Sequence, residues 1–311
     1  MRFLDSAKAV LALVGPTAVG KTELSLQIAE QLNGEIISAD SRCFYRGMDI
    51  GTAKPSLEER ARIPHHLVDI LNPDEAYSLA EFQLAASEAI ETIHMRHKLP
   101  ILVGGTGQYV WSMVEGWKIP PQEPDLHLRR ALEHWADTIG PAELYQRLKY
   151  LDPEAATHIE PNNVRRTVRG LEVIFRTGKR FSAQKQKELS PYDWLIIGVA
   201  RPRTEVFQRI DQRVDAMISA GLENEVRGLL SQGYSPELPA LSAIGYREMV
   251  SVVQGLLTTG EAATRIKSLT HQFVRRQTNW FKADDPRIHW VEAGSTQAED
   301  VLSYIRSAQG L

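Results

Sequence analysis

Short apolar runs recur along the chain, separated by stretches that have the period of amphipathic helices. A run of four to eight apolar residues is typical of a strand that is buried on both faces. Helical patterns occupy residues 21–32 and 79–97. Strands that alternate with helices predict an α/β fold, in which a mainly parallel sheet is covered by helices on both faces. The expected strands are residues 9–14, 35–38, 66–71, 99–104, 194–200 and 287–292.

The alternation of strands and helices stops between about residues 115 and 193. This segment is rich in Glu, Arg and Lys, has a helical period and contains no run that resembles a strand. A proline-rich turn at residues 119–124 leads into it. We therefore expect an all-helical insertion domain, residues 115–193, within a core domain made of residues 1–114 and 194–311.

The first apolar run leads directly into a glycine motif that precedes a predicted helix. The motif fits the pattern G-x-x-x-x-G-K-[ST] of a phosphate-binding loop, or P-loop. Backbone N–H groups of such a loop bind phosphate oxygens, its Lys suits a terminal phosphate, and its Thr hydroxyl suits a Mg²⁺ ion. The sequence therefore predicts a chain that binds a di- or triphosphate. The loop residues are Gly15, Pro16, Thr17, Ala18, Val19, Gly20, Lys21 and Thr22, the last being the expected metal ligand.

A carboxylate is expected near this loop, but not where a P-loop hydrolase carries it. The strand at residues 99–104 runs into Gly-Thr-Gly, without an Asp, whereas Asp40 follows the strand at residues 35–38. Ligands of parallel sheets bind at the carboxyl ends of the strands, so we expect Asp40, Thr106 and the P-loop to line one crevice. Two simpler roles remain open: Asp40 as an Asx-type cap of the next turn, and Thr106 as a helix N-cap.

Beyond the P-loop the chain resembles a known family. Residues 40–55, DSRCFYRGMDIGTAKP, are similar to the signature of the tRNA dimethylallyltransferases, in the bacterial type that lacks a zinc finger. The chain departs from the family pattern at Cys43, where Gln is common, at Asn163, where Asp is common, and at Gly170, where Ala is common. Further similar segments are residues 104–109, 166–173, 177–179, 221–226, 245–248 and 275–281.

This resemblance implies an activity. Such an enzyme transfers a dimethylallyl group from dimethylallyl diphosphate to N6 of adenosine 37 in the tRNA anticodon loop, and it releases diphosphate. The P-loop would hold the diphosphate, with Mg²⁺ as the cofactor. Asp40 would accept the N6 proton, and Thr106 would hydrogen-bond the adenine or steady the diphosphate.

Two arginines are expected to stabilise the leaving group. Arg209 and Arg213 lie four residues apart, so they share one face of a predicted helix. The resemblance implies that at least one of them reaches the diphosphate. An ordinary surface pair with Glu205 and Asp211 would show the same spacing.

Two basic stretches are candidates for binding the tRNA anticodon stem-loop. Residues 165–187 hold eight Lys and Arg, and residues 262–283 hold five and no acid. A solvated helix face gives the same pattern, but an enzyme that extracts a stacked base needs cations to bind the phosphates. The aromatic residues of the second stretch, Phe273 and Trp280, follow a helical stripe with Ile266 and Leu269, which favours a core role over the alternative of platforms for base stacking. The expected tRNA contacts are Asp40, Ser41, Arg42, Cys43, Thr106, Arg129, Arg165, Arg166, Arg169, Tyr246, Arg247, Arg275, Arg276 and Gln277.

Composition mainly excludes other classes. A chain of 311 residues with 43% hydrophobic and 24% charged residues is not disordered, and its single Cys43 excludes an internal disulfide. No apolar run approaches the roughly 18 to 20 residues of a membrane helix. The N-terminal run leads into the glycine motif and does not resemble a signal peptide, so we expect a cytoplasmic protein, and we expect it to be a monomer. His94 and His97 lack further metal ligands and predict a solvated helix face. Two other functions remain open: a phosphotransferase of the nucleoside-kinase type and a nucleotide-gated RNA-binding protein.

Overall fold

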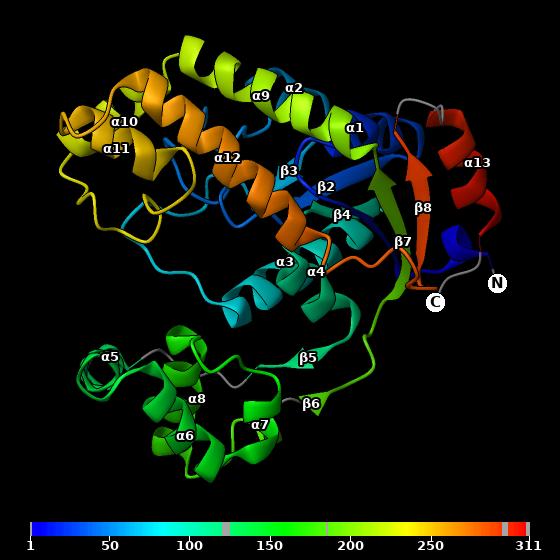
Figure 1. Ribbon diagram of the computed structural model, residues 1–311. Helices are drawn as coiled ribbons and strands as arrows, with labels where there is room; N and C mark the ends of the chain where they lie inside the picture. The colour runs from blue at the N-terminus through cyan, green and yellow to red at the C-terminus, as the bar shows by residue number, and fades with distance from the viewer. Residues whose placement is uncertain (1, 120–124, 185, 294–297, 309–311) are drawn as a thin grey trace. The chain divides into compact units, whose positions relative to one another are not determined.

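The computed structural model describes residues 2–119, 125–184, 186–293 and 298–308 (Figure 1). The chain divides into two compact units, a core unit of residues 1–114 and 190–311 and an insertion of residues 115–189. The second boundary lies four residues before the expected one, because the segment before β7 (Asp193–Ala200) already packs on the core. The Trp194 indole N–H donates to the Ser190 hydroxyl (2.8 Å), and the Tyr192 ring meets the Trp194 ring edge-on.

The core unit is built on a six-stranded sheet in the order β3-β2-β4-β1-β7-β8. All pairs of neighbouring strands in this sheet are parallel, which confirms the expected α/β class. The central strands are buried along almost their whole length, as their continuous apolar runs predict. The other strands are β1 (Ala9–Val14), β2 (Gly34–Ser38), β3 (His65–His66), β4 (Leu99–Gly104) and β8 (Ile288–Glu292).

The strand expected at residues 66–71 is wrong for most of its length. β3 contains two residues, because the chain turns through the left-handed region at Leu67 (φ 59°) and Asp69 (φ 57°). Leu67 and Leu71 are buried, so the apolar pattern reflects a packed loop. Leu71 forms an isolated parallel bridge with Tyr45.

Helices cover both faces of the sheet (Figure 1). α1 (Lys21–Gln31) links β1 to β2, and α3 (Leu79–Met95) links β3 to β4 in the opposite direction along the sheet. Because parallel crossovers are right-handed, these two helices lie on opposite faces. α13 (Ala298–Ser307) packs beside α1, and α4 (Gly107–Val114) packs beside α3. Short helices at Phe3–Asp5 (η1) and Leu57–Arg62 (α2) complete this part of the unit.

Four further helices connect β7 to β8. α9 (Arg203–Ser219) and α12 (Thr259–Gln277) pack against each other, and both carry residues to the carboxyl edge of the sheet (Figure 1). Between them lie α10 (Leu222–Ser231) and α11 (Tyr246–Val253). The core role expected for Phe273 and Trp280 is confirmed only in part, since these side chains are 36% and 38% exposed, although Trp280 packs on Gly107.

The insertion contains α5 (Leu126–Ile139), α6 (Pro141–Leu151), α7 (Pro153–Thr157) and α8 (Val164–Thr177), with a short 3-10 turn at Ser182–Gln184. It is not all-helical, because β5 (Trp117–Lys118) and β6 (Gln186–Lys187) form a short antiparallel pair. Gly170 lets α6 approach α8, since a Cβ there would lie 2.9 Å from Leu148. Most of the expected turn at 119–124, together with Lys185, lies outside the described residues. Neither unit's described helices are long and apolar enough to cross a membrane.

Candidate active site

The loop between β1 and α1 has the backbone of an anion-binding nest. Gly15 (φ 142°) lies so close to β7 that a Cβ would meet the Val199 carbonyl oxygen at 2.5 Å, so only glycine fits. Ala18 (φ 69°) and Gly20 (φ 109°) are left-handed, which turns successive N–H groups to one side of the loop. Within the part of the chain that the structure describes, the amides of residues 18–22 donate to no protein acceptor. Five consecutive N–H groups are thus available to an anion at the start of α1.

The Lys21 ammonium spans the first half of this loop. Its Nζ donates to the carbonyl oxygens of Gly15 (2.9 Å) and Pro16 (2.7 Å). Burial lowers the pKa of Lys21 to about 8, an effect that Asp40 opposes and Arg213 reinforces. The lysine is therefore beside both the loop and the expected carboxylate.

Arginines surround the rest of the loop. Arg209 donates from Nε to the Ala18 carbonyl (2.8 Å), and Arg213 donates to the Thr52 carbonyl (3.4 Å) while interacting with Asp40. Burial lowers the pKa of the Arg213 guanidinium, and the Asp40 charge opposes that shift. Arg201, which the sequence interpretation missed, donates to the Val19 carbonyl (3.4 Å). In the sequence, Arg201 directly follows the apolar run of a central strand, and this position indicates a residue at the ligand-binding edge of the sheet.

The surface-pair interpretation of Arg209 and Arg213 is wrong. Glu205 instead pairs with Arg201 (2.9 Å), and Asp211 pairs with His271 (3.0 Å). Both α9 arginines are therefore directed to the loops at the edge of the sheet.

Asp40 forms the Asx turn that was the simpler of its two expected roles, and its geometry leaves the other role possible. Its Oδ1 accepts a hydrogen bond from the Arg42 backbone N–H (3.0 Å), which is the Asx turn. Its Oδ2 accepts no hydrogen bond from any described residue, and the carboxylate interacts with the charges of Lys21 and Arg213. One oxygen thus fixes the side chain, and the other is available to a substrate.

Thr106 lies at the start of α4, as expected. Its carbonyl oxygen accepts from the N–H groups of Tyr109 (2.9 Å) and Val110 (3.2 Å), while its half-buried hydroxyl bonds to no described residue. The N-cap interpretation of the Thr106 hydroxyl is therefore wrong.

Gln277 is not on the surface, so its expected RNA contact is wrong. The side chain is 5% exposed and lies between two loops. Its Oε1 accepts from the Thr17 N–H (2.9 Å), and its Nε2 donates to the Gly105 carbonyl (3.1 Å). Gly105 leaves room for this amide, because a Cβ there would lie 2.4 Å from Nε2. The last residue of α12 thus links the P-loop to the end of β4.

Two more expected tRNA contacts are buried. Cys43 is 6% exposed, and burial raises the pKa of its thiol. Tyr246 has no exposed surface, burial raises the pKa of its phenol, and its hydroxyl donates to Glu225 (2.5 Å). Glu225 also accepts from the backbone N–H groups of residues 49–51. Both side chains therefore serve the fold of the 40–55 segment rather than an RNA surface.

The remaining expected contacts of the core unit lie at or near its surface. Arg275 and Arg276 are exposed and stack on the Phe207 and Phe273 rings at 5.9 Å, without an acidic partner among the described residues. Arg247 is exposed but pairs with Glu248 (3.0 Å). Arg42 donates to the Pro239 carbonyl (3.2 Å), and Ser41 beside it is half-buried.

The predicted RNA-binding arginines of the insertion differ in whether they have a carboxylate partner. Arg165 and Arg166 are exposed and pair with no carboxylate in the described chain. Arg129 (2.9 Å) and Arg169 (2.7 Å) instead both bind Glu172, which is fully buried and also accepts from the Asp125 backbone N–H. A buried carboxylate requires such partners, so these two arginines stabilise the insertion itself.

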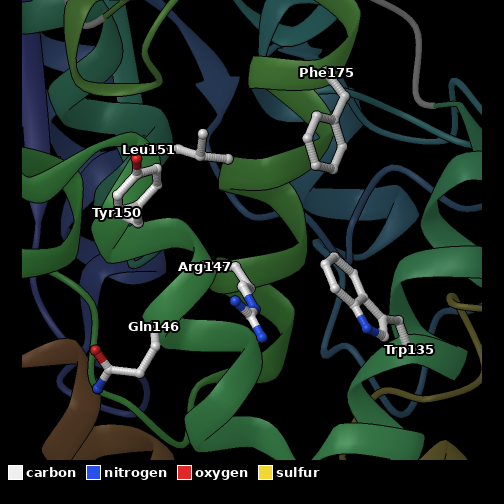
Figure 2. Close-up of a pocket in the computed structure, with 6 residues that line it drawn as sticks. All are labelled: Trp135, Gln146, Arg147, Tyr150, Leu151 and Phe175. Atoms are coloured by element: carbon white, nitrogen blue, oxygen red, sulfur yellow. The ribbon is translucent and has the colours of Figure 1, made fainter.

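The insertion also carries a groove that the sequence interpretation did not identify. Figure 2 shows the side chains that line it, which belong to α5, α6 and α8, and its volume is about 340 Å³. Tyr150 and Phe175 are 87% and 51% exposed, which is unusual for aromatic side chains. The lining residues are Trp135, Gln146, Arg147, Tyr150, Leu151 and Phe175.

The possible metal ligands are few. The described residues contain no group of three or more His, Cys, Asp or Glu side chains that could hold a metal ion. Thr22 is exposed at the first turn of α1. The solvated face expected for His94 is wrong, because its Nε2 lies 2.9 Å from the Ala9 carbonyl oxygen.

Comparison with known proteins agrees with this architecture. The family model described as IPP transferase matches residues 43–284. A tRNA dimethylallyltransferase of Roseiflexus sp. (strain RS-1) is 52% identical over 273 residues, which are 88% of this chain and 90% of that protein. One from Thermomicrobium roseum is 48% identical over 279 residues, which are 90% of this chain and 85% of that protein.

Solved structures are similar over nearly the whole chain. The tRNA isopentenylpyrophosphate transferase of Bacillus halodurans is 39% identical, with a TM-score of 0.70 over 96% of this chain and 94% of that one. A eukaryotic dimethylallyltransferase acting on tRNA is 30% identical, with a TM-score of 0.77 over 96% of this chain and 76% of that one. With a P-loop and an aspartate at the carboxyl edge of a parallel sheet, and with these matches over most of its length, the chain belongs to the IPP transferase family.

Proposed function

We propose that this chain transfers a dimethylallyl group from dimethylallyl diphosphate to N6 of adenosine 37 in the anticodon loop of tRNA, releasing diphosphate. The observation that carries this proposal is the pairing of an anion nest with a carboxylate that has one unbonded oxygen. A base and a leaving-group site lie next to each other, as a displacement reaction requires. The names of the relatives support this activity over the two alternatives, the phosphotransferase and the nucleotide-gated RNA-binding protein.

The leaving group accounts for the cations around the P-loop. As the allylic C–O bond breaks, negative charge grows on the diphosphate oxygen, while the new C–N bond forms at N6. The amides of residues 18–22 and the Lys21 ammonium would stabilise that charge in a fixed arrangement. Arg209 and Arg213 would supply further positive charge from one face of α9.

Asp40 would act as the general base. The N6 amine becomes acidic as it bonds to carbon, and Oδ2 would accept the proton that it loses. The Arg42 N–H bond to Oδ1 would hold the carboxylate in place, so that the free oxygen keeps one direction. Thr106, whose hydroxyl is also unbonded in the described chain, would hydrogen-bond the adenine or the diphosphate.

Mg²⁺ fits the residue types at this edge. The ion prefers oxygen ligands and commonly binds phosphate oxygens together with one or two protein groups. The exposed Thr22 hydroxyl would be the protein ligand. When bound, Mg²⁺ would neutralise charge on the departing diphosphate.

The RNA surface would use the exposed, unpaired arginines of each unit. Arg275 and Arg276 in the core unit and Arg165 and Arg166 in the insertion are suited to phosphate contacts. Such contacts would offset the few kcal/mol that extracting a stacked base costs. We expect a monomer that acts in the cytoplasm, where the free Cys43 stays reduced.

Thermal unfolding in the presence of candidate ligands tests the donor. Dimethylallyl diphosphate with Mg²⁺, at 100 times its Kd, should stabilise the protein by about 2.7 kcal/mol. This corresponds to a Tm increase of about 5 to 10 °C for a unit of this size. ATP with Mg²⁺ at the same concentration should give a smaller shift. A larger shift with ATP would favour the phosphotransferase instead.

A further inference from the structure

The two halves of the P-loop offer different numbers of hydrogen-bond donors to a ligand. Pro16 has no backbone N–H, and the Thr17 N–H is bound by the Gln277 Oε1 (2.9 Å). The amides of residues 18–22 have no protein acceptor in the described chain. Pro16 and Thr17, the closed half of the loop, therefore offer no N–H to a phosphate oxygen, whereas the amides of residues 18–22, the open half, do.

The Gln277 amide is held in one orientation. Its Nε2 donates to the Gly105 carbonyl (3.1 Å), so a flipped amide would place NH₂ against the Thr17 N–H and oxygen against a carbonyl oxygen. The residue is buried, and the neighbouring Trp280 packs so closely on Gly107 that a Cβ there would lie 2.3 Å from it. The end of α12 is thus fixed, and an acceptor is permanently placed on the Thr17 N–H.

The closed half of the loop is the side on which an outer phosphate would bind. In P-loops the lysine reaches the terminal phosphates of the ligand. Here the Lys21 Nζ lies between the Gly15 and Pro16 carbonyl oxygens, at the closed half. A phosphate that extended past the amides of residues 18–22 to Thr17 would meet the Gln277 oxygen instead of a free N–H.

We propose that Gln277, together with Pro16, determines phosphate-chain specificity and restricts this P-loop to a group of two phosphates. The proposal deepens the proposed function and depends on it for the identity of the ligand as a diphosphate. In this proposal the end of α12 fixes the P-loop, while the same helix carries the exposed arginines Arg275 and Arg276. Gln277 would act on the ligand through the Thr17 amide, so it is a positioning residue.

The test compares inorganic diphosphate with inorganic tripolyphosphate, measured by calorimetry at saturating Mg²⁺ without tRNA. The wild type should bind diphosphate at least tenfold more tightly. Gln277→Ala frees the Thr17 N–H, so this preference should fall by about tenfold, the value of one hydrogen bond to a charged group. Gln277→Glu keeps an acceptor there and adds a negative charge, so it should weaken both ligands but keep or increase the preference. Gln272→Ala, an exposed glutamine of the same helix, is the control.

A purely structural role for Gln277 predicts that the ratio of the two affinities stays the same in both variants, whatever happens to stability. That result overturns the proposal. Equal affinities in the wild type overturn it without any variant, even if Gln277→Ala does not fold. Transfer of the dimethylallyl group to tRNA is assayed separately. If the enzyme prenylates tRNA but binds diphosphate and tripolyphosphate equally, only the specificity role of Gln277 is rejected. If it prefers diphosphate but does not prenylate tRNA, only the proposed function is rejected.

Discussion

The two oxygens of Asp40 have different surroundings. Oδ1 accepts the Arg42 backbone N–H, and Oδ2 accepts no hydrogen bond from any described residue. An amide side chain can keep the first contact, because Asn also offers an Oδ1 acceptor. It cannot accept a proton with its NH₂ group, so the structural and catalytic roles of this residue can be separated.

Asp40→Asn should retain the fold and tRNA affinity but lower single-turnover transfer by about 10² to 10⁴-fold, the usual contribution of a general base. Rapid-quench assays with saturating donor and tRNA measure this rate. Asp74→Asn, at an exposed position, is the matched control and should be unchanged. A rate near that of the wild type for Asp40→Asn would falsify the assignment of Asp40 as the base.

Lys21 gives the site a pH dependence. Its pKa is lowered to about 8, so its charge is present below pH 8 and is lost as the pH rises through that value. Donor binding favours the charged form, and the Kd of dimethylallyl diphosphate should therefore increase about tenfold between pH 7 and pH 9. Lys21→Arg, which stays charged, should lack this increase. Identical profiles for the two proteins would show that another group titrates.

At the scale of single elements, α8 illustrates how one basic helix serves two purposes. Arg169 binds the buried Glu172, whereas Arg165 and Arg166 face solvent. Sequence spacing alone places Arg166 and Arg169 on a common face and does not distinguish them. The distinction depends on Glu172, which the fold buries between Arg129 and Arg169.

Replacing Arg165 and Arg166 together by Ala should weaken binding of an anticodon stem-loop without changing the melting temperature. Affinity should fall about equally for cognate and loop-mutant RNA, because phosphate contacts carry little sequence information. The plot of log association constant against log salt concentration should become less steep by roughly 0.7 to 0.9 for each lost phosphate contact. Arg306→Ala in α13 is the charge control. Unchanged slopes and affinities would show that this helix face does not contact the RNA.

α10 and α11 hold the segment after Asp40 by means of one carboxylate. Glu225 accepts from three backbone N–H groups and from the Tyr246 hydroxyl. Tyr246→Phe should therefore cost about 1 to 3 kcal/mol in the free energy of urea unfolding and leave tRNA affinity unchanged. Tyr234→Phe, whose hydroxyl bonds to no described residue, is the control for stability. Loss of RNA affinity in Tyr246→Phe, with stability intact, contradicts its interior role.

At the scale of the whole molecule, the sequence predicts the structural elements that are specified by a local pattern of apolar and polar residues. The strands at residues 9–14, 99–104 and 194–200 were predictable because strands buried in a parallel sheet are continuous apolar runs. β3 was overestimated, since a packed loop buries apolar side chains as a strand does. The pair β5 and β6 is too short to produce a period.

The candidate site divides in the same way. The P-loop and Asp40 could be predicted, because a contiguous motif and a strand end specify their positions. Gln277, Cys43 and Tyr246 were assigned to RNA because a family signature does not show whether a side chain points inward. The partner of Gln277 lies 260 residues away along the chain, and only the packing of α12 brings the two together.

The most direct test is the chemical identity of the product. The wild type is incubated with tRNA, dimethylallyl diphosphate and Mg²⁺, and the anticodon-loop adenosine is then analysed by mass spectrometry of the digested RNA. We predict one dimethylallyl group on N6 of adenosine 37 and one diphosphate released for each modified tRNA. Unmodified adenosine, with the donor only hydrolysed or with phosphate transferred from ATP, contradicts the proposed function.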